Sequence, residues 1–367
     1  MRIALVGTRG VPARYGGFET AAEEIGRRLV ERGHEVVVYC RNADPEQVEY
    51  LGMELVHLRS LRLKFSETLT HTAMSLMHLR SRPVDVAVVF NAANAPLLPI
   101  VRRRGIPVAV HVDGLESLRA KWGGIGRAYY KKAEKVAVRW ADELIADARG
   151  IQEHYALTYG VSSRLIAYGA PLLYDRPDHR LEELGLRSAR YHLVVARFEP
   201  ENCIDVIVDG YQQSEAELPL IVVGSAPYGN RYRQRVESRA ANDERVRLLG
   251  PVWDQELLDQ LYAHASSYVH GHSVGGTNPS LLRAMGAGAP VIAIDVRFTR
   301  EVLEDTGVFF RGPSDLAGLI SGAEADPKAA RERGRRGRER AASAYVWEDV
   351  VDDYERMCQR LHEDAQS

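Results

Sequence analysis

Short apolar runs alternate with helix-forming stretches along almost the whole chain, and this alternation limits the possible folds more than any other feature. The runs RIALV, DVAVVF and PVAVHV lie in the first half, and HLVVA, PLIVV and PVIAI lie in the second. Continuous apolar strands separated by helices predict a parallel sheet that is covered by helices on both faces. The sequence therefore predicts an α/β fold built from doubly wound, Rossmann-like sheets.

The length of the chain and a restart of this alternation predict two domains. At 367 residues with an apolar fraction of 45%, the chain can fill two ordinary cores. The alternation restarts after a segment with prolines at 171 and 177, which would suit a hinge. We expect one Rossmann-like domain over residues 1–172 and a second over residues 173–346, followed by a terminal amphipathic helix over residues 347–367.

Charge and cysteine content narrow the functional classes. The formal net charge is −2, so nothing global favours a nucleic-acid partner. Three widely spaced cysteines without paired metal-ligand spacing predict reduced thiols in the cytoplasm and no zinc site. The N-terminus lacks the long apolar run of a signal peptide, and polar residues and prolines interrupt the most apolar window. We expect a soluble protein.

The stretch HGHSVGGTNPSLLRAMGAGAPVIAID reads as strand, glycine loop, helix and strand. Asn278 can cap the helix, and Pro279 suits its first position. Gly275 and Gly276 allow the backbone to approach a ligand closely. The main-chain N–H groups at the start of the helix would then face an anion. The pattern predicts a phosphate-binding seat, and the alternative is an ordinary turn between strand and helix.

A second glycine loop, GTRGVPARYGG, follows the first strand. Gly16 and Gly17 stand just before a helix expected over residues 18–32, where their N–H groups could meet a diphosphate or a sugar. The alternative is a flexible turn. The spacing is not G-x-G-x-x-G, and the second strand ends in Arg41 rather than in an acidic residue that could hold a ribose. A nicotinamide cofactor is therefore not expected.

The segments GGTNPSLL, TRGVPARYGGFET, HVDGLE and ARFEPEN together resemble the retaining GT-B glycosyltransferases of the glycogen-synthase-like superfamily, in their bacterial rhamnosyltransferase-like branch. The resemblance implies two Rossmann-like domains facing a cleft, with the C-terminal helix packed back on the first. It also implies transfer of a sugar, with rhamnosyl as a candidate, from a nucleoside-diphosphate sugar to a surface glycan or lipid-linked acceptor. Because the chain has no D-x-D pair, no metal cofactor is expected.

The resemblance also implies roles for individual residues. Arg197 would grip the leaving diphosphate, and His111 and Asp113 would lie near the donor sugar, although a lone histidine is more often structural. Glu116 and Arg119 would contact the acceptor. The implied donor-binding residues are Gly16, Gly17, Asn202, Gly275, Gly276, Thr277, Asn278, Ser280, Leu281 and Arg283.

The chain departs from the family where an E-x7-E pair is usual, because Gly275 and Arg283 occupy those positions. An arginine cannot accept hydrogen bonds from ribose hydroxyls as a glutamate does. Arg283 would therefore either reach the diphosphate or pair with a neighbouring acid and leave the ribose unclamped. The missing glutamates keep two alternatives open: a non-catalytic protein that binds a sugar nucleotide or glycan, and a sugar-nucleotide 2-epimerase.

Basic and aromatic residues are interleaved between positions 119 and 139. A helix with this composition suits the headgroup layer of an anionic membrane, where lipid-linked acceptors reside. We therefore expect peripheral contact with the inner face of the membrane, and the alternative is an ordinary solvated helix.

Overall fold

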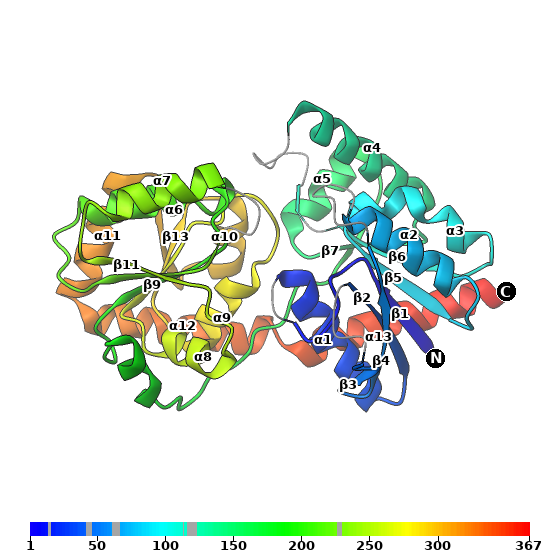
Figure 1. Ribbon diagram of the computed structural model, residues 1–367, viewed down its shortest axis with the longest axis horizontal. Helices are drawn as coiled ribbons and strands as arrows, with labels where there is room; N and C mark the ends of the chain where they lie inside the picture. The colour runs from blue at the N-terminus through cyan, green and yellow to red at the C-terminus, as the bar shows by residue number, and fades with distance from the viewer. Residues whose placement is uncertain (14–15, 42–45, 61–66, 113, 116–122, 226–229) are drawn as a thin grey trace. The chain divides into compact units, whose positions relative to one another are not determined.

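The computed structural model describes residues 1–13, 16–41, 46–60, 67–112, 114–115, 123–225 and 230–367 (Figure 1). The chain divides into two compact units. The first unit combines Met1–Tyr168 with Trp347–Ser367, and the second is Gly169–Val346. Each unit has its own mainly parallel sheet. The predicted α/β class with two Rossmann-like sheets is confirmed.

The sheet of the first unit has the strand order β3-β4-β2-β1-β5-β6-β7-β8. Its strands are β1 (Arg2–Val6), β2 (Glu35–Arg41), β3 (Glu49–Tyr50), β4 (Met53–Leu58), β5 (Val86–Phe90), β6 (Val108–Val112), β7 (Glu143–Ala146) and β8 (Arg164–Leu165). All neighbouring pairs are parallel except β3–β4. The strand order reverses at β1, which pairs with both β2 and β5. Such a reversal opens a crevice at the carboxyl ends of the strands.

The helices of the first unit include the C-terminal one. They are α1 (Gly17–Glu31), α2 (Glu67–Leu79), η1 (Ala92–Leu97), α3 (Pro99–Arg102), α4 (Gly124–Trp140), α5 (Arg149–Tyr159) and α13 (Trp347–Gln366). Helix α13, drawn in red in Figure 1, packs against α1. Arg28 of α1 and Arg32, the residue after this helix, both pair with Glu348 of α13, at 2.8 and 2.9 Å. An apolar stripe and these ion pairs hold the end of the chain to the first sheet.

The sheet of the second unit is entirely parallel, with the order β11-β10-β9-β12-β13-β14. Its strands are β9 (His192–Val195), β10 (Leu220–Val223), β11 (Val246–Gly250), β12 (Ser267–His270), β13 (Val291–Ile294) and β14 (Gly307–Phe310). Here the order reverses between β9 and β12. The loops that leave these two strands therefore diverge over a crevice, which is where open α/β sheets bind ligands.

Helices cover both faces of the second sheet. They are η3 (His179–Leu184), η4 (Pro200–Asn202), α6 (Ile204–Gln212), α7 (Asn230–Ala240), α8 (Gln255–Ala263), α9 (Pro279–Ala287), α10 (Arg297–Leu303), α11 (Pro313–Ala325) and α12 (Pro327–Ala344). Figure 1 shows α6, α7 and α11 on one face and α8, α9 and α12 on the other. Buried Ile207, Tyr211 and Ile320 belong to the core between the first group and the sheet.

A polar network is buried under the same sheet. His192 Nδ1 lies 2.8 Å from Ser267 Oγ, and His192 Nε2 lies 2.8 Å from a carboxylate oxygen of Glu324 on α11. That carboxylate also accepts hydrogen bonds from the main-chain N–H groups of Glu217 and Leu218. His192 and Ser267 have no exposed surface, so the network joins α11 to the sheet and is closed to substrates.

The connection between the units differs from the hinge expected at residues 171–178. The Ala170 N–H donates to Tyr345 O at 2.7 Å, and the Leu173 N–H donates to Gly286 O at 3.0 Å. These bonds hold the proline-containing segment to the second unit, so the chain changes unit at Tyr168–Gly169. Across the described residues, no helix is both long and apolar enough to cross a bilayer.

Candidate functional site

Two loops meet at the reversal of strand order in the second sheet. The Asn202 side-chain amide donates to Arg197 O at 2.7 Å, and its carbonyl oxygen lies 2.7 Å from His272 Nδ1. The N–H and hydroxyl of Ser273 both donate to Glu201 O, at 2.8 and 2.9 Å. The loop after β9 and the loop after β12 are thus joined by side-chain and main-chain hydrogen bonds, although they lie about 70 residues apart in sequence.

Gly271 allows this close approach. A Cβ at this position would stand 2.3 Å from Asn202 O and 2.9 Å from the Cδ1 of Ile207. Since the first of these atoms belongs to the backbone, it cannot move aside easily. A side chain at position 271 would force the two loops apart.

The glycine loop and the start of α9 have the form that the sequence predicts. The Asn278 side chain accepts from the Ser280 N–H at 2.9 Å and from its hydroxyl at 2.8 Å, and Pro279 is the first residue of the helix. Gly275 has a φ of +140°. Within the described chain, the main-chain N–H groups of Gly275 and Gly276 donate no hydrogen bond. These donors, together with the positive end of the helix dipole, can receive an anion.

The other donor-binding residues predicted on this stretch are placed in different ways. Thr277 is buried at the helix start, and Leu281 is a core residue with only 1% of its surface exposed. The side chain of Leu281 therefore faces the protein rather than a ligand. Leu281 could therefore contribute only main-chain groups to a donor site. Thr277 could contribute main-chain groups, or its buried side chain could hold neighbouring residues in position.

Arg197 provides the positive charge at the rim of the site. It lies two residues beyond the end of β9, and 37% of its side-chain surface is exposed. Its Nη1 atom lies 3.8 Å from a carboxylate oxygen of Glu199, which is a loose ion pair. A doubly charged phosphate group could compete with the Glu199 carboxylate for the guanidinium.

Arg283 pairs with an acid from a neighbouring helix. Its Nη1 atom contacts Asp259 Oδ1 on α8, and the Gln255 side-chain amide donates to the same oxygen at 2.8 Å. The side chains of Arg283 and Asp259 are 21% and 10% exposed. Of the two arrangements expected for Arg283, the structure has the ion pair. A donor-binding role for this residue stays a prediction.

A buried layer lies directly behind the helix start. The Tyr268 hydroxyl lies 3.1 Å from Ser280 Oγ and 3.3 Å from His270 Nδ1. Burial lowers the pKa of His270 to about 3, so its imidazole is neutral near pH 7. Sequence reasoning missed Tyr268, His270 and His272 as supports of the site. The sequence signal that could have identified them is the pair His270 and His272, two residues apart at the end of a strand.

The loop at the N-terminal glycine pair is occupied by carboxylates of its own helix. Glu19 accepts from the Arg9 N–H at 2.8 Å, and Glu23 accepts from the Ala13 N–H at 2.6 Å. Gly16, with a φ of +112°, precedes α1, and Gly17 is the first residue of that helix. Desolvation raises the pKa of Glu19. An anion bound here would meet the carboxylate of Glu19, so the donor-binding role of the pair stays a prediction.

His111 is enclosed in the core of the first unit. It has no exposed surface, its Nδ1 lies 3.2 Å from the Tyr354 hydroxyl of α13, and the rings of Phe18, Phe90 and Tyr168 surround it. Burial lowers its pKa to about 3. This placement favours the structural alternative over contact with a donor sugar. The predicted residues Asp113, Glu116 and Arg119 lie outside the described residues.

The search for metal-binding clusters concerns the described positions only. Among them, no group of three or more His, Cys, Asp or Glu side chains could hold a metal ion. The three cysteines are free thiols.

Two family models match the chain. Residues 1–171 match a domain of unknown function, DUF1972, and residues 189–325 match the family described as glycosyl transferases group 1. The second domain belongs to the group 1 glycosyl transferases. The family match assigns residues 189–325 to the glycosyl transferases, and the whole chain has the two-sheet architecture of the GT-B fold.

Individual proteins agree with this assignment over different lengths. The α-maltose-1-phosphate synthase of Mycolicibacterium smegmatis is 25% identical over 96% of this chain and 97% of its own length. The GtfA subunit of a UDP-N-acetylglucosamine–peptide N-acetylglucosaminyltransferase from Streptococcus gordonii is 31% identical over 32% of this chain, which spans only 23% of that relative. The structure of sucrose-phosphate synthase from Thermosynechococcus elongatus superposes with a TM-score of 0.83 at 22% identity, covering 99% of both chains.

Proposed function

We propose that this glycosyltransferase moves a sugar from a nucleoside-diphosphate sugar to a glycan or lipid-linked acceptor of a surface polysaccharide. One observation carries the proposal. At the strand-order reversal of the second sheet, an accessible arginine stands on the same rim as a glycine loop whose N–H groups are available and a capped helix start. That combination suits a diphosphate. The name of the GtfA relative, with its UDP-activated sugar, agrees with such a donor.

The chemistry needs stabilisation of the leaving group more than it needs a protein nucleophile. Departure of the nucleoside diphosphate builds negative charge on its outer phosphate. Arg197 and the positive end of α9 would neutralise that charge. The acceptor hydroxyl would attack from the face that the diphosphate leaves, so the anomeric configuration is retained. Because protein groups supply the positive charge, we propose that transfer proceeds without a metal ion, with rhamnosyl as the candidate sugar.

We further propose that the enzyme works in the cytoplasm and touches the inner face of the membrane through α4. Exposed Arg127, Lys131 and Lys135 follow one another at four-residue spacing on this helix. The Ile125 side chain near its start is 91% exposed. These residues form a basic stripe with an apolar end, which suits anionic headgroups.

The aromatic residues of α4 do not share this stripe. The Tyr129 hydroxyl donates to Ala93 O at 2.8 Å, and Tyr130 is buried. The pattern of interleaved basic and aromatic residues therefore separates on folding, with the basic residues outside and these two tyrosines inside. Any membrane contact through the described part of α4 would be mainly electrostatic.

A pair of arginines that flank the same strand gives a sharp test of the donor site. Arg197 follows β9, and exposed Arg190 precedes it at the other end. Arg197→Ala removes a charge-assisted contact of about 1.5 to 3 kcal/mol and should lower kcat/KM by roughly ten- to a hundredfold. Arg190→Ala removes the same charge and should leave kcat/KM unchanged. Equal kinetics of the two variants would exclude the diphosphate role of Arg197.

The same assays separate the alternatives. A 2-epimerase would convert a free nucleotide sugar to its epimer without an acceptor. A non-catalytic binder would show nucleotide affinity without donor hydrolysis or transfer. Of these two alternatives, the ion pair between Arg283 and Asp259 favours the non-catalytic binder, because the charge of Arg283 is already neutralised by Asp259. Transfer or slow donor hydrolysis by the pure protein would exclude it.

A further inference from the structure

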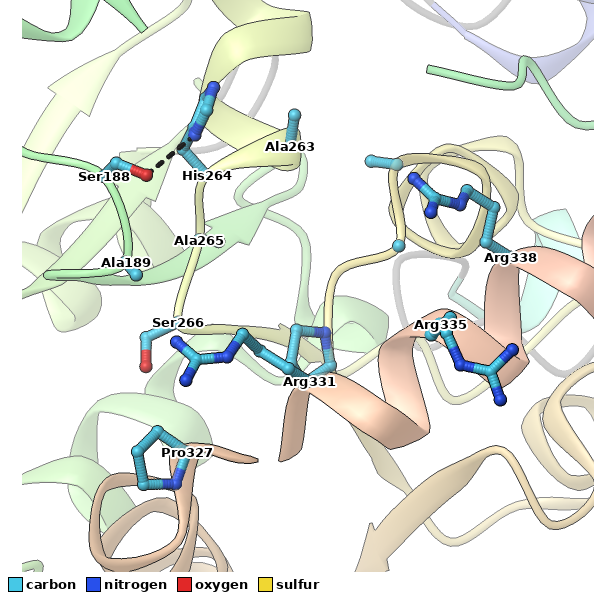
Figure 2. A pocket seen from close by; sticks show the side chains of 13 residues that line it. Ser188, Ala189, Ala263, His264, Ala265, Ser266, Pro327, Arg331, Arg335 and Arg338 are labelled. Atoms are coloured by element: carbon cyan, nitrogen blue, oxygen red, sulfur yellow. Dashed lines mark hydrogen bonds between the residues drawn. The ribbon is translucent and has the colours of Figure 1, made fainter. Parts of the chain in front are cut away.

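A cavity of about 380 Å³ lies in the second unit at the end of the sheet opposite to the glycine loop. Segments that enter three strands form its walls. Ser188 and Ala189 precede β9, and Ala265 and Ser266 precede β12 (Figure 2). Pro290, which also lines the cavity, precedes β13. The anion seat lies where β9 and β12 end. A strand of four residues is about 13 Å long, so the cavity and the seat are separate places.

Helix α12 supplies three arginines to this cavity. Arg331, Arg335 and Arg338 are spaced by four and three residues, which puts them on one face of the helix (Figure 2). Arg335 is neutralised by Glu332, at 2.6 Å, and by Glu339. Within the described residues, Arg331 and Arg338 have neither an ion pair nor a hydrogen bond. Two guanidinium groups with unused donors therefore line one pocket.

These arginines could instead serve the main-chain carbonyls where α8 and α9 end, because both helix ends also line the cavity. Such bonds occur elsewhere on α12, where Arg340 donates to Val302 O at 2.7 Å. No such bond forms from Arg331 or Arg338 to any described residue. Arg338 lies over the Tyr174 ring, 4.9 Å from its centroid, which orients the guanidinium and leaves its N–H donors available.

The shape and chemistry of the pocket indicate its ligand. A guanidinium binds phosphate oxygens through two parallel N–H donors. Helix α12 begins at Pro327 on the same wall. Because the Asp326 carboxylate accepts from the Ala329 N–H of its first turn at 2.9 Å, the arginines supply the positive charge. His264, hydrogen-bonded to Ser188 Oγ at 2.8 Å, adds a polar edge. The volume falls within the usual range for small-molecule pockets of about 300 to 1,000 Å³ and exceeds the needs of bare phosphate. We propose that this pocket binds a small phosphomonoester, of the size of a sugar phosphate, through Arg331 and Arg338.

Calorimetry with ribose 5-phosphate tests the site on the whole chain, and ribose serves as the uncharged probe. The wild type should bind one ribose 5-phosphate and no ribose. Arg331→Gln and Arg338→Gln should each weaken binding roughly tenfold or more, since each removes a charge-assisted contact. Arg333→Gln is the matched control, because it removes the same charge from the same helix outside the cavity lining. Binding should stay unchanged in this control and in Arg197→Ala.

Each opposite result would overturn the proposal. An equal loss of ribose 5-phosphate affinity in Arg333→Gln would mean that the positive charge of the helix attracts anions without a specific binding pocket. A loss in Arg197→Ala would place the ribose 5-phosphate at the glycine loop instead. No binding to the wild type would exclude the pocket as a phosphomonoester site. Melting temperatures equal to that of the wild type would show that the Arg331→Gln and Arg338→Gln variants are folded.

Discussion

The ion pair between Arg283 and Asp259 makes a single substitution informative. Arg283→Glu would set two carboxylates against each other where Asp259 is only 10% exposed. Breaking a buried pair costs about 3 to 5 kcal/mol and breaking a surface pair less than about 1 kcal/mol. This half-buried pair lies between those limits, at about 2 kcal/mol. For a domain of this size, that lowers the melting temperature by roughly 4 to 8 °C.

A second substitution separates this loss of stability from any gain in ribose binding. Adding Asp259→Asn to Arg283→Glu removes the repulsion, and Gln255 can still donate to the remaining oxygen of residue 259. The double variant should recover most of the lost melting temperature. If position 283 faces the ribose, its new carboxylate can accept from both hydroxyls. UDP, with a 2′-hydroxyl, should then gain roughly tenfold more affinity than the deoxyribose nucleotide dTDP.

Thermal unfolding of the single and double variants, and calorimetry with UDP and dTDP, measure both effects. Asp259→Asn alone is the control for the loss of the pair without a new carboxylate. An Arg283→Glu variant as stable as the wild type would refute the energetic role of the pair. Equal weakening of UDP and dTDP would identify Arg283 as a diphosphate ligand, and unchanged affinities would put position 283 outside the donor site.

Two further predictions concern pH and membranes. Although burial raises the pKa of Glu324, hydrogen bonds from His192 and two main-chain N–H groups lower it overall from 4.5. The resulting contribution to the free energy of unfolding is present above the unfolded pKa and is lost as pH falls through the lower folded pKa. In Glu324→Gln, the free energy of unfolding measured in urea should therefore depend less on pH in that window. Lys131→Glu with Lys135→Glu should weaken co-sedimentation with anionic vesicles roughly tenfold or more, at about 1 kcal/mol per basic residue. Reversing the exposed arginines at 103–104 should not.

Local sequence patterns predicted the strands, helices and helix caps, which depend mainly on residues close in sequence. The first strand was expected at residues 2–6 and forms there, and the cap at Asn278 followed from its type and from the proline after it. The helix expected over residues 18–32 forms one residue earlier, at Gly17–Glu31. The amphipathic stretch at the C-terminus is α13. Periodicity and capping are encoded within a few residues, so a single sequence carries them.

Contacts between distant residues could not be predicted in this way. The family resemblance placed His111 near the donor sugar, yet Tyr354, 243 residues later, lies against it in the core. The proline segment looked like a linker, yet its N–H groups bond to Tyr345 and Gly286. The partner of Arg283 on α8 is 24 residues away and was foreseen only as an unnamed acid. In each case the deciding partner comes from an element whose position depends on the whole fold.

The two ends of the second sheet show the same limit for ligand sites. The rule that open parallel sheets bind ligands beyond their carboxyl ends leads from the strand pattern to the loops after β9 and β12. The family resemblance then singles out Arg197 and the glycine loop within them. No such rule covers the opposite end. The arginine-rich stretch of α12 reads as a solvated face, because its sequence gives no sign of what it packs against. The loops near positions 188 and 265 line the same cavity as Arg331 and Arg338, and they lie together because β9 and β12 are neighbours in the sheet. The strand pairing that creates the anion seat at one end thus also shapes the arginine-lined cavity at the other.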